Sequence, residues 1–273
     1  ALSISGLQMQ TLFRNPMAGP YVLGLSSGSS LGVAFVILGF SAGISPDAIS
    51  GIGNWSIAFA AWAGAGLIMM LMMVIASKVE NILTVLIIGI MLSSGISAVV
   101  SIMQYFSNET MLKAYIVWTM GSLGNLTSTQ LTVLLISVTF GVIMAIISVK
   151  PLNALLMGEN YARTIGMNLK LSRFIIIAST SILTGTVTAF CGPIGFIGLA
   201  VPHLARILFM TSDHRILIPG TILTGGTLML LSDILSQMPW SDNVLHVNSI
   251  TALIGIPVVI WVIMHNRKYS EIF

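Results

Sequence analysis

The chain has 273 residues, of which 56% are hydrophobic and only 7% are charged, and its formal net charge at pH 7 is +3. Soluble domains carry about a quarter charged residues, so this composition excludes a soluble globular domain and predicts an all-α polytopic membrane protein. The small net charge argues against a nucleic-acid partner, and the single cysteine, Cys191, excludes an internal disulfide.

Nine apolar segments resemble membrane-spanning helices, which need roughly 20 residues each. In chain order they are residues 1–13, 21–40, 55–77, 82–103, 126–148, 174–190, 194–210, 216–237 and 249–264. The first is apolar from Ala1 onward and lacks the charged opening of a signal peptide. We therefore expect it to be the second half of a helix whose start is missing. A shorter apolar stretch, residues 111–121, is predicted to lie at the membrane interface.

The linkers between these segments carry nearly all of the charge. If the segments alternate across the membrane and the C-terminus is cytoplasmic, ten basic residues face the cytoplasm and only Lys113 faces the other side. The ten are Arg14, Lys78, Lys150, Arg163, Lys170, Arg173, Arg206, Arg215, Arg267 and Lys268. The opposite face also receives Asp47, Glu109 and Asp242. Cytoplasmic loops are enriched in Lys and Arg, so this bias predicts the orientation of the chain.

Several sequence patterns could indicate a catalytic or metal-binding function, and each also has a simpler structural interpretation. Ser26 is central in a G-x-S-x-G pattern that could mark an intramembrane hydrolase with His203 as its base, but serine and glycine are also common packing residues in membrane helices. His203 and His214 have no third ligand at helical spacing, so we interpret them as helix-end or loop histidines and predict no metal site. Asp233 is the clearest carboxylate within a span, and we assign it a structural hydrogen-bonding role.

No lysine follows a glycine in this sequence, so a Walker A loop is absent and ATP hydrolysis by that route is excluded. We accordingly predict no catalytic residue and no cofactor bound by this chain.

The longest polar connection runs over residues 151–173, on the basic face. Pro151 and Asn153 can open a helix, and Gly158 and Gly166 can interrupt one, so we predict two short helices here. A connection this long favours docking to a soluble partner, and a surface loop without a partner is the alternative. The apolar anchors at helical spacing would be Leu155, Tyr161 and Ile165. Gly166 is expected to end its helix in a left-handed conformation.

Three blocks of the sequence carry a family resemblance. They are "SGLQMQTLFRNPMAGPYVLGLSSGSSLG", "LNALLMGENYARTIGMNLKLSR" and "GPIGFIGLAVPHLARILFMTSDHRILIPG", and "TALIGIPVVIWVI" continues the match near the end. Together they resemble the FecCD-type permeases of bacterial ATP-binding cassette (ABC) importers, which take up iron–siderophores, haem and cobalamin. The last of the three blocks is long and specific, and the resemblance covers essentially the whole chain.

The resemblance implies an ABC importer type II permease bundle of ten helices, about nine of them present, in a single transmembrane domain over residues 1–273. It implies a multi-pass protein of the bacterial inner membrane that moves a metal chelate. The implied partners are two ATPase subunits that bind ATP and Mg, a second permease copy or a close paralogue, and a periplasmic substrate-binding protein. An ion-coupled secondary transporter is the alternative, although that class uses mid-membrane carboxylates, which this sequence almost lacks.

The resemblance also assigns residues. It places Gly158, Glu159, Ala162 and Gly166 in the ATPase-coupling loop, and it places the cytoplasmic gate at Asn15, Met17, Ile82 and Leu83. Two positions depart from the family pattern: residues 245–248 read Leu-His-Val-Asn where Leu-Pro-x-Gly is common, and Gln237 stands where an arginine often docks the binding protein.

The third block is predicted to be a bent helix beside the coupling loop. Gly192 and Pro193 are expected to break the chain at the outer surface, Gly195 and Gly198 to allow close packing, and Pro202 to kink the helix. The residues expected at the inner end and the cytoplasmic turn are His203, Arg206, Asp213, His214 and Arg215.

Overall fold

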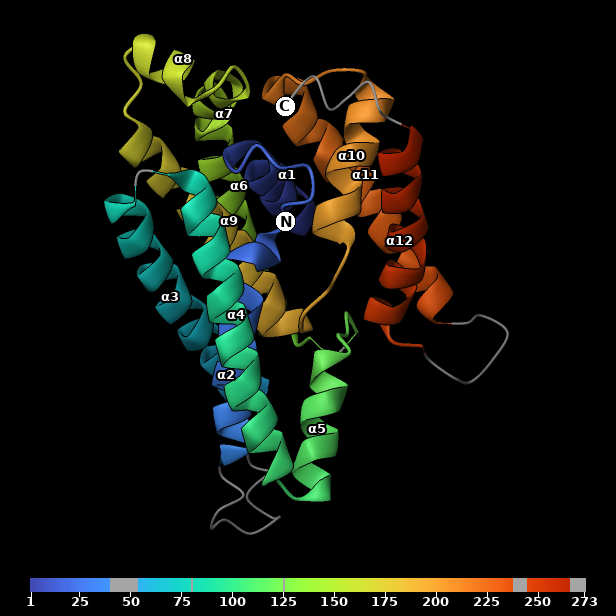
Figure 1. Ribbon diagram of the computed structural model, residues 1–273. Helices are drawn as coiled ribbons and strands as arrows, with labels where there is room; N and C mark the ends of the chain where they lie inside the picture. Colours follow the sequence, from blue (N-terminus) through green and yellow to red (C-terminus); the bar gives the residue numbers. More distant parts are fainter. Residues whose placement is uncertain (40–53, 80, 125, 238–244, 266–273) are drawn as a thin grey trace.

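A computed structural model describes residues 1–39, 54–79, 81–124, 126–237 and 245–265, and in these ranges the chain folds into twelve α-helices and one 3-10 helix (Figure 1). In chain order they are α1 (Leu2–Leu12), η1 (Pro20–Leu23), α2 (Leu25–Ile37), α3 (Asn54–Lys78), α4 (Ile82–Tyr105), α5 (Glu109–Thr119), α6 (Ser128–Ile147), α7 (Val149–Leu156), α8 (Glu159–Thr164), α9 (Leu169–Cys191), α10 (Ile197–Phe209), α11 (His214–Ser236) and α12 (Val247–His265). The chain is a helical membrane bundle.

Each of the nine predicted segments corresponds to a helix. Five of the helices, α3, α4, α6, α9 and α11, are long and apolar enough to cross a membrane by themselves, and α2, α10 and α12 contain shorter apolar helices. The predicted segment 21–40 is split, because Gly24 adopts a left-handed conformation (φ +75°) between η1 and α2. A side chain there would meet Ser93 on α4, so this break lets two elements pack closely.

Two predicted boundaries differ from the structure at α9 and α10. α9 begins at Leu169 rather than residue 174, because the Asn168 side chain accepts a hydrogen bond from the Leu171 N–H (3.1 Å) and caps the helix. α10 begins at Ile197 rather than residue 194. The start of α9 therefore lies within the predicted coupling loop of residues 151–173.

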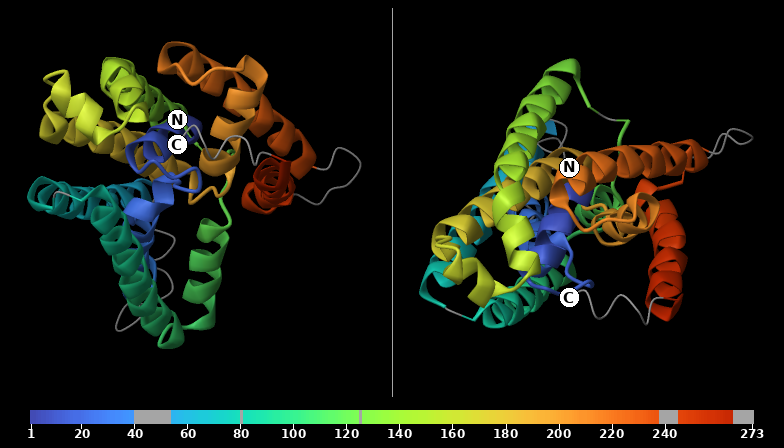
Figure 2. Two further views of the ribbon diagram at one scale, coloured as in Figure 1. Left: turned by 45° about the horizontal axis from the view of Figure 1, so that its top comes forward. Right: turned by 90° about the horizontal axis from the view of Figure 1, so that it is seen from above.

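The centre of the bundle is formed by α1 and α9. All eleven residues of α1 are buried, and 72% of the most apolar window of α9 is buried, against 17–33% for the other four long spans. α9 contacts α1, α2, α3 and α6, and α1 also contacts α10 and α11. In the views of Figure 2, α1 lies in the middle with the longer helices around it. α2, α3, α6, α10 and α11 pack against these two helices.

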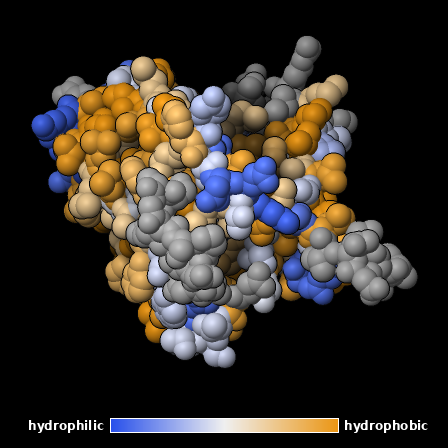
Figure 3. Space-filling view, turned by 90° about the horizontal axis from the view of Figure 1, so that it is seen from below, coloured by the Kyte–Doolittle hydropathy of each residue, from blue (hydrophilic) through white to orange (hydrophobic). Residues whose placement is uncertain are grey.

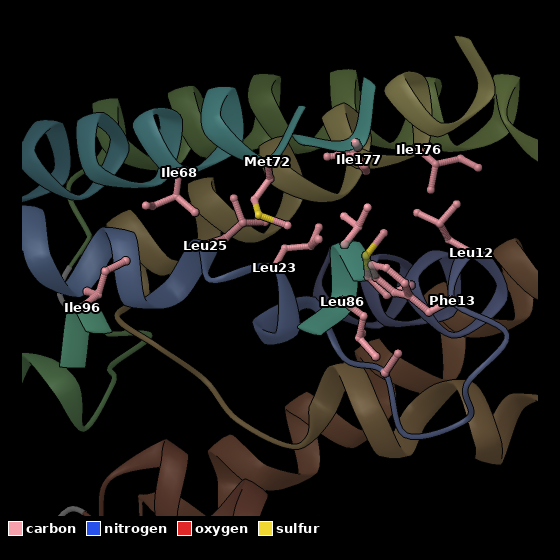
Figure 4. Packing of buried hydrophobic residues seen from close by; sticks show 14 of the residues in the cluster. Leu12, Phe13, Leu23, Leu25, Ile68, Met72, Leu86, Ile96, Ile176 and Ile177 are labelled. Carbon is pink, nitrogen blue, oxygen red and sulfur yellow. The ribbon is translucent and has the colours of Figure 1, made fainter. Parts of the chain in front are cut away.

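A hydrophobic cluster joins the central helices on one side (Figure 4). It contains Phe13 at the end of α1, Leu23 in η1, Leu25 in α2, Met72 in α3 and Ile176 in α9, each 1% exposed or less. Burying a large aliphatic or aromatic side chain contributes about 1.5–3 kcal/mol relative to exposing it to water. Most of the chain's outer apolar residues remain exposed, as expected for helices that face lipid.

Polar residues gather at the two ends of the bundle. α7 and α8 lie at one end, and α5 lies toward the opposite end, at the level of the far half of α4 (Figure 1). Of the basic residues assigned to the cytoplasmic face, Arg267 and Lys268 lie outside the described residues, and the other eight belong to helix ends and connections at the α7–α8 end. Lys113 belongs to α5. Seen from below, the molecule shows broad hydrophobic flanks with polar residues in clusters between them (Figure 3).

Small residues let two pairs of helices approach to backbone contact. A Cβ added to Gly64 on α3 would lie 2.0 Å from the carbonyl oxygen of Gly28 on α2. A Cβ added to Gly6 on α1 would lie 1.5 Å from the carbonyl oxygen of Gly198 on α10. Small residues at helix crossings are the usual means of close packing in membranes, and these contacts account for the glycine-rich composition.

The α2–α3 crossing yields a matched test. Gly64→Ala and Gly66→Ala both place a methyl group on α3, and both gain the same helix propensity of about 1 kcal/mol. Gly66 has nothing within 4 Å of the added Cβ, whereas at Gly64 the α2 backbone must move, at a cost of roughly 1–3 kcal/mol or more. We expect Gly64→Ala to lower the thermal unfolding temperature of the purified protein and Gly66→Ala to leave it equal or higher. Equal unfolding temperatures for the two variants would contradict the crossing.

Candidate functional site

The predicted coupling segment folds as the two short helices α7 and α8 at one end of the bundle (Figure 1). Gly158 (φ +106°) separates them, and Gly166 (φ +81°) follows α8 in the left-handed conformation that the sequence predicts. α7 directly continues α6, because Ser148 ends one helix and begins the next. The segment is therefore a rigid extension of a membrane helix rather than a loose loop.

The side chains of this segment divide into an outer and an inner set. Tyr161 (48% exposed) and Ile165 (57% exposed) face outward and could anchor a partner. Leu155 is only 1% exposed and packs in the main hydrophobic cluster, so its prediction as an anchor is wrong. Ala162 is likewise fully buried. Met157, which the sequence analysis did not single out, is 69% exposed beside Gly158 and joins the outer set.

Glu159 makes its contact within the subunit rather than on the outer surface. Its Oε1 accepts a hydrogen bond and forms an ion pair with the Arg173 guanidinium at 2.5 Å, with side chains 25% and 6% exposed. Arg173 also donates to the Val79 carbonyl, just beyond the end of α3 (3.4 Å). This pair fixes α8 to the first turns of α9. Arg173 and Arg206 are both more than 90% buried.

A second set of contacts joins α7 to the turn between α10 and α11. Asn153 on α7 donates through Nδ2 to Asp213 Oδ1 (2.6 Å), and its Oδ1 accepts from the backbone N–H of His214 (2.9 Å). Asp213 in turn caps α11 by accepting from the Arg215 N–H (2.9 Å). The hydrogen bonds from Arg215 and then from Asn153 stabilise the carboxylate and hold the pKa of Asp213 below its usual value.

His214 links these contacts to α1 at the centre of the bundle. It is the first residue of α11 and is fully buried, so of the two interpretations offered for it the helix-end one holds and the loop one does not. Its Nδ1 lies 2.7 Å from Asn153 Oδ1, and its Nε2 lies 2.9 Å from the Thr11 hydroxyl on α1. Asn153 and Thr11 thus hold one imidazole between α7 and α1.

Gln10 and His203 join α1 to α10. Gln10 accepts from Arg206 through Oε1 (2.6 Å) and donates to the Leu199 carbonyl (3.1 Å). His203 Nε2 lies 2.8 Å from the carbonyl oxygen of Pro16, in the turn that follows α1. His203, Arg206 and the 213–215 turn therefore meet around α1. Within the described residues no group of three potential metal ligands is found.

Pro202 explains the closeness of α1 and α10. It lies inside α10 and cannot donate a hydrogen bond to the carbonyl of Gly198, four residues earlier. That same carbonyl oxygen is the atom that approaches Gly6 on α1. At the other end of the bend, α9 ends at Cys191, Gly192 takes φ +74°, and Pro193 and Gly195 lie in the irregular connection. The Gly195 N–H donates to Asn248 Oδ1 (2.9 Å), so one of the departures from the family pattern stabilises this turn.

The predicted gate residues lie on two neighbouring turns, and one of them does not qualify. Met17 (44% exposed) and Leu83 (51% exposed) are on the surface of the subunit. Their backbone N–H groups donate to Asn15 Oδ1 and Asn81 Oδ1 respectively, each at 2.9 Å, so short polar side chains fix both turns. Ile82 is 8% exposed and belongs to the hydrophobic cluster. A gate between two subunits needs surface residues, so Ile82 is removed from it.

The two remaining candidate residues, Ser26 and Asp233, have structural explanations. Ser26 is a buried residue in the first turn of α2, and no strand precedes it within the described residues, as a nucleophile elbow would require. Asp233 lies in the last turn of α11, where its Oδ2 accepts a hydrogen bond from Gln237 Nε2 (3.0 Å). Asp233 and Gln237 are therefore mutual partners at the end of one helix.

Comparisons with known proteins agree with this arrangement. The sequence pattern of the FecCD transport family matches residues 1–265. The vitamin B12 import system permease protein BtuC of Escherichia coli O9:H4 (strain HS) is 35% identical over 269 residues, covering 98% of this chain and 79% of the relative. The protein of the same name from Shigella boydii serotype 18 gives the same values. BtuC of Escherichia coli O6:H1 (strain CFT073) is 36% identical over 267 residues, covering 97% and 78%.

A solved structure is also similar. It is described as an inward-facing conformation of a metal-chelate type ABC transporter, and it superposes with a TM-score of 0.86 at 29% sequence identity, covering 97% of this chain and 81% of that one.

The contacts of Asn153 generate a testable prediction. Asn153→Ala leaves the buried His214 and the Asp213 cap without their α7 partner, which we expect to lower the free energy of unfolding by roughly 1–3 kcal/mol. Asn160→Ala on α8 is the matched control, because the residue is exposed and the change should stay within about 0.5 kcal/mol. Thermal unfolding of both purified variants measures the difference. A loss in Asn160→Ala equal to that in Asn153→Ala would show that α7 is not held through this side chain.

Proposed function

The chain belongs to the FecCD transport family, and we propose that it is the transmembrane permease subunit of an ABC importer that moves a metal chelate across the bacterial inner membrane. The observation that carries the proposal is the pair of helices α7 and α8. They expose apolar residues at one end of the bundle and are bonded on their inner side to α9 and to the start of α11, whose His214 in turn bonds to α1. Such a segment is suited to receive a movement from a soluble partner and pass it inward.

The proposed partners follow from this arrangement and from the relatives. Two ATPase subunits, which would bind ATP and Mg, dock on α8 through Tyr161 and Ile165, with Met157 beside them. A second copy of the chain, or a close paralogue, completes the pathway, and a periplasmic binding protein delivers the substrate. The α7–α8 end is then cytoplasmic, together with the end of α12. The coupling segment in this proposal is residues 151–173, within a single domain over residues 1–273.

The substrate class rests on the relatives. Those described above are named for vitamin B12 import, and the similar structure is described as a metal-chelate transporter. A cobalt corrinoid such as cobalamin is therefore the substrate we favour, with iron–siderophores and haem as other chelates of the same class. No specific observation favours the ion-coupled alternative: Asp233, the carboxylate it would need, lies in the last turn of α11 and is bonded to Gln237.

The contacts described above define a route from the ATPases to the gate. A displacement of α8 moves α7, since only Met157 and Gly158 separate them. α7 carries Asn153 and hence His214, whose other ring nitrogen meets Thr11 near the end of α1. α1 leads directly into the turn of residues 14–17, which His203 also contacts through Pro16. ATP binding would in this way bias the turn between two arrangements.

Coupling can be tested at Gly166. A β-branched residue is strained at φ +81° even though open space surrounds the position. We expect Gly166→Val to reduce substrate uptake at least about ten-fold, which corresponds to roughly 1.4 kcal/mol, while the ATPase subunits still hydrolyse ATP. Thr164→Val, which keeps the same bulk on exposed α8, is the control. Uptake and ATPase rates of reconstituted vesicles provide the measurement, and unchanged coupling in Gly166→Val would refute the role of the turn.

The gate can be tested at Met17. With Cys191 replaced by serine, Met17→Cys should cross-link to its counterpart in the second subunit in one nucleotide state and not in another. Phe59→Cys on the outer face of α3 (58% exposed) is the control and should not cross-link in either state. Cross-linked dimer on denaturing gels is the readout. If an assembled dimer gave no Met17→Cys product with or without ATP, Met17 would lie away from the two-fold axis.

A further inference from the structure

A basic pocket lies where α3 ends and α9 begins. It has a volume of about 310 Å³ and is lined by four cationic side chains: Lys78 from the last turn of α3, Arg163 from α8, and Lys170 and Arg173 from the first turns of α9. Arg173 is the one held by Glu159. Lys78, Arg163 and Lys170 are exposed and form no side-chain hydrogen bond or ion pair with any other described residue.

Three cations around one cavity repel one another, and a bound anion or water lowers this electrostatic repulsion. The described carboxylate nearest to them, Glu159, is already engaged by Arg173. Glu80 follows Val79 in the sequence but lies outside the described residues. The pocket is therefore suited to bind an anionic group of the size of a phosphate ester.

The position of the pocket indicates which phosphate. It is formed by the ends of two membrane-spanning helices, and so lies at the level where lipid headgroups meet water. Figures 1 and 2 show the end of α3 and the start of α9 side by side at the periphery of the subunit. Below Lys78, the outer face of α3 exposes Leu67, Met70 and Val74, each more than half exposed. A soluble partner would not reach that apolar face, whereas a lipid would.

A second cavity, a groove, lies further along the same pair of helices. It has a volume of about 460 Å³ and lies between α3, α6 and α9, with Trp62 and Met69 on α3, Phe140 on α6 and Gly185 on α9 among its lining residues. Met69 and Lys78 are nine residues apart, so the groove begins about 14 Å along α3 from the cation, close to half of the roughly 30 Å hydrocarbon thickness. Its lining is mainly apolar, which suits the end of an acyl chain, and Ser137, Ser181 and Thr186 are the polar exceptions.

We propose that this seam binds one anionic phospholipid, with its phosphate among Lys78, Arg163 and Lys170 and an acyl chain extending along α3 to the near end of the groove at Met69. Basic pockets between transmembrane helices are a recurring form of lipid-headgroup site. Because α8 and the start of α9 line the pocket, the lipid would lie against the coupling helices, whereas the opposite end of α3 has no part in it. The proposal concerns lipid binding alone and stands whether or not the transport function above is correct.

Tryptophan quenching tests this on the full chain. A variant that keeps Trp62 and replaces the other tryptophans by phenylalanine is reconstituted in phosphatidylcholine vesicles. Phosphatidylglycerol or phosphatidylcholine with bromine near the chain ends is then added at equal mole fractions. We expect brominated phosphatidylglycerol to quench Trp62 more strongly at low mole fraction, which gives an association preference for the anionic lipid.

Charge variants with a matched control make the test specific. Lys170→Gln should reduce the preference about five-fold, since each cation at an anionic surface contributes on that order. The combined Lys78→Gln, Arg163→Gln and Lys170→Gln variant should abolish it. Lys150→Gln removes one exposed charge at the same end of the bundle, on α7, and should keep the preference. Circular dichroism of each variant establishes that the helices are intact.

Three outcomes would overturn the proposal. Equal quenching by the two lipids would mean that no anionic lipid is selected. A preference that survives the combined variant, or that falls equally in Lys150→Gln, would place its origin elsewhere. If the vesicle-bound protein shows no lipid preference but is stabilised against heat by inorganic phosphate and not by chloride at equal ionic strength, the pocket binds a free anion instead.

Discussion

The structure depends on one constraint: the polar side chains of α1 are buried at the centre of a bundle that offers them no water. Buried polar groups must be hydrogen-bonded, and an unmade bond costs about 1–3 kcal/mol. Gln8 bonds to Ser148 and Thr180, Gln10 to Arg206, and Thr11 to His214. Each partner lies on or beside a different helix, so satisfying α1 fixes the positions of α6, α9, α10 and α11 around it.

The same constraint joins the helices of the bundle into one mechanical unit. Hydrogen bonds in a dry interior are directional and costly to break, so helices joined by them move together rather than slide. Backbone contact at Gly6 and Gly198 adds a steric lock between α1 and α10. The α7–α8 end is joined to this central unit through Asn153 and through the Glu159–Arg173 pair. What remains free to face partners is a small set of exposed side chains.

The requirement that buried polar groups be bonded also governs where charged residues lie. Lysines and arginines gather at the α7–α8 end, where those with an internal task, Arg173 and Arg206, are buried and bonded, and those without one stay on the surface. The two groups have the same residue type and similar spacing, and only their surroundings separate them. The exposed cations Lys78, Arg163 and Lys170 next to an apolar flank are suited to meet anionic lipid, whereas the exposed Tyr161 and Ile165 on α8 are suited to meet protein.

The sequence by itself determined the class of protein, the nine apolar segments and the short coupling helices, because hydropathy, charge bias and glycine punctuation are local signals. It also placed Gly166 in a left-handed turn for a local steric reason. It could not show that Leu155 and Ile82 face inward or that His214 is buried, because these depend on which helix lies alongside. The early start of α9, by contrast, follows from the local cap that Asn168 provides. Asn153 gave no signal at all beyond helix initiation. Only the tertiary structure brings Thr11, Asn153 and His214 together from three distant segments, because a hydrogen bond is decided by the partner that packing supplies.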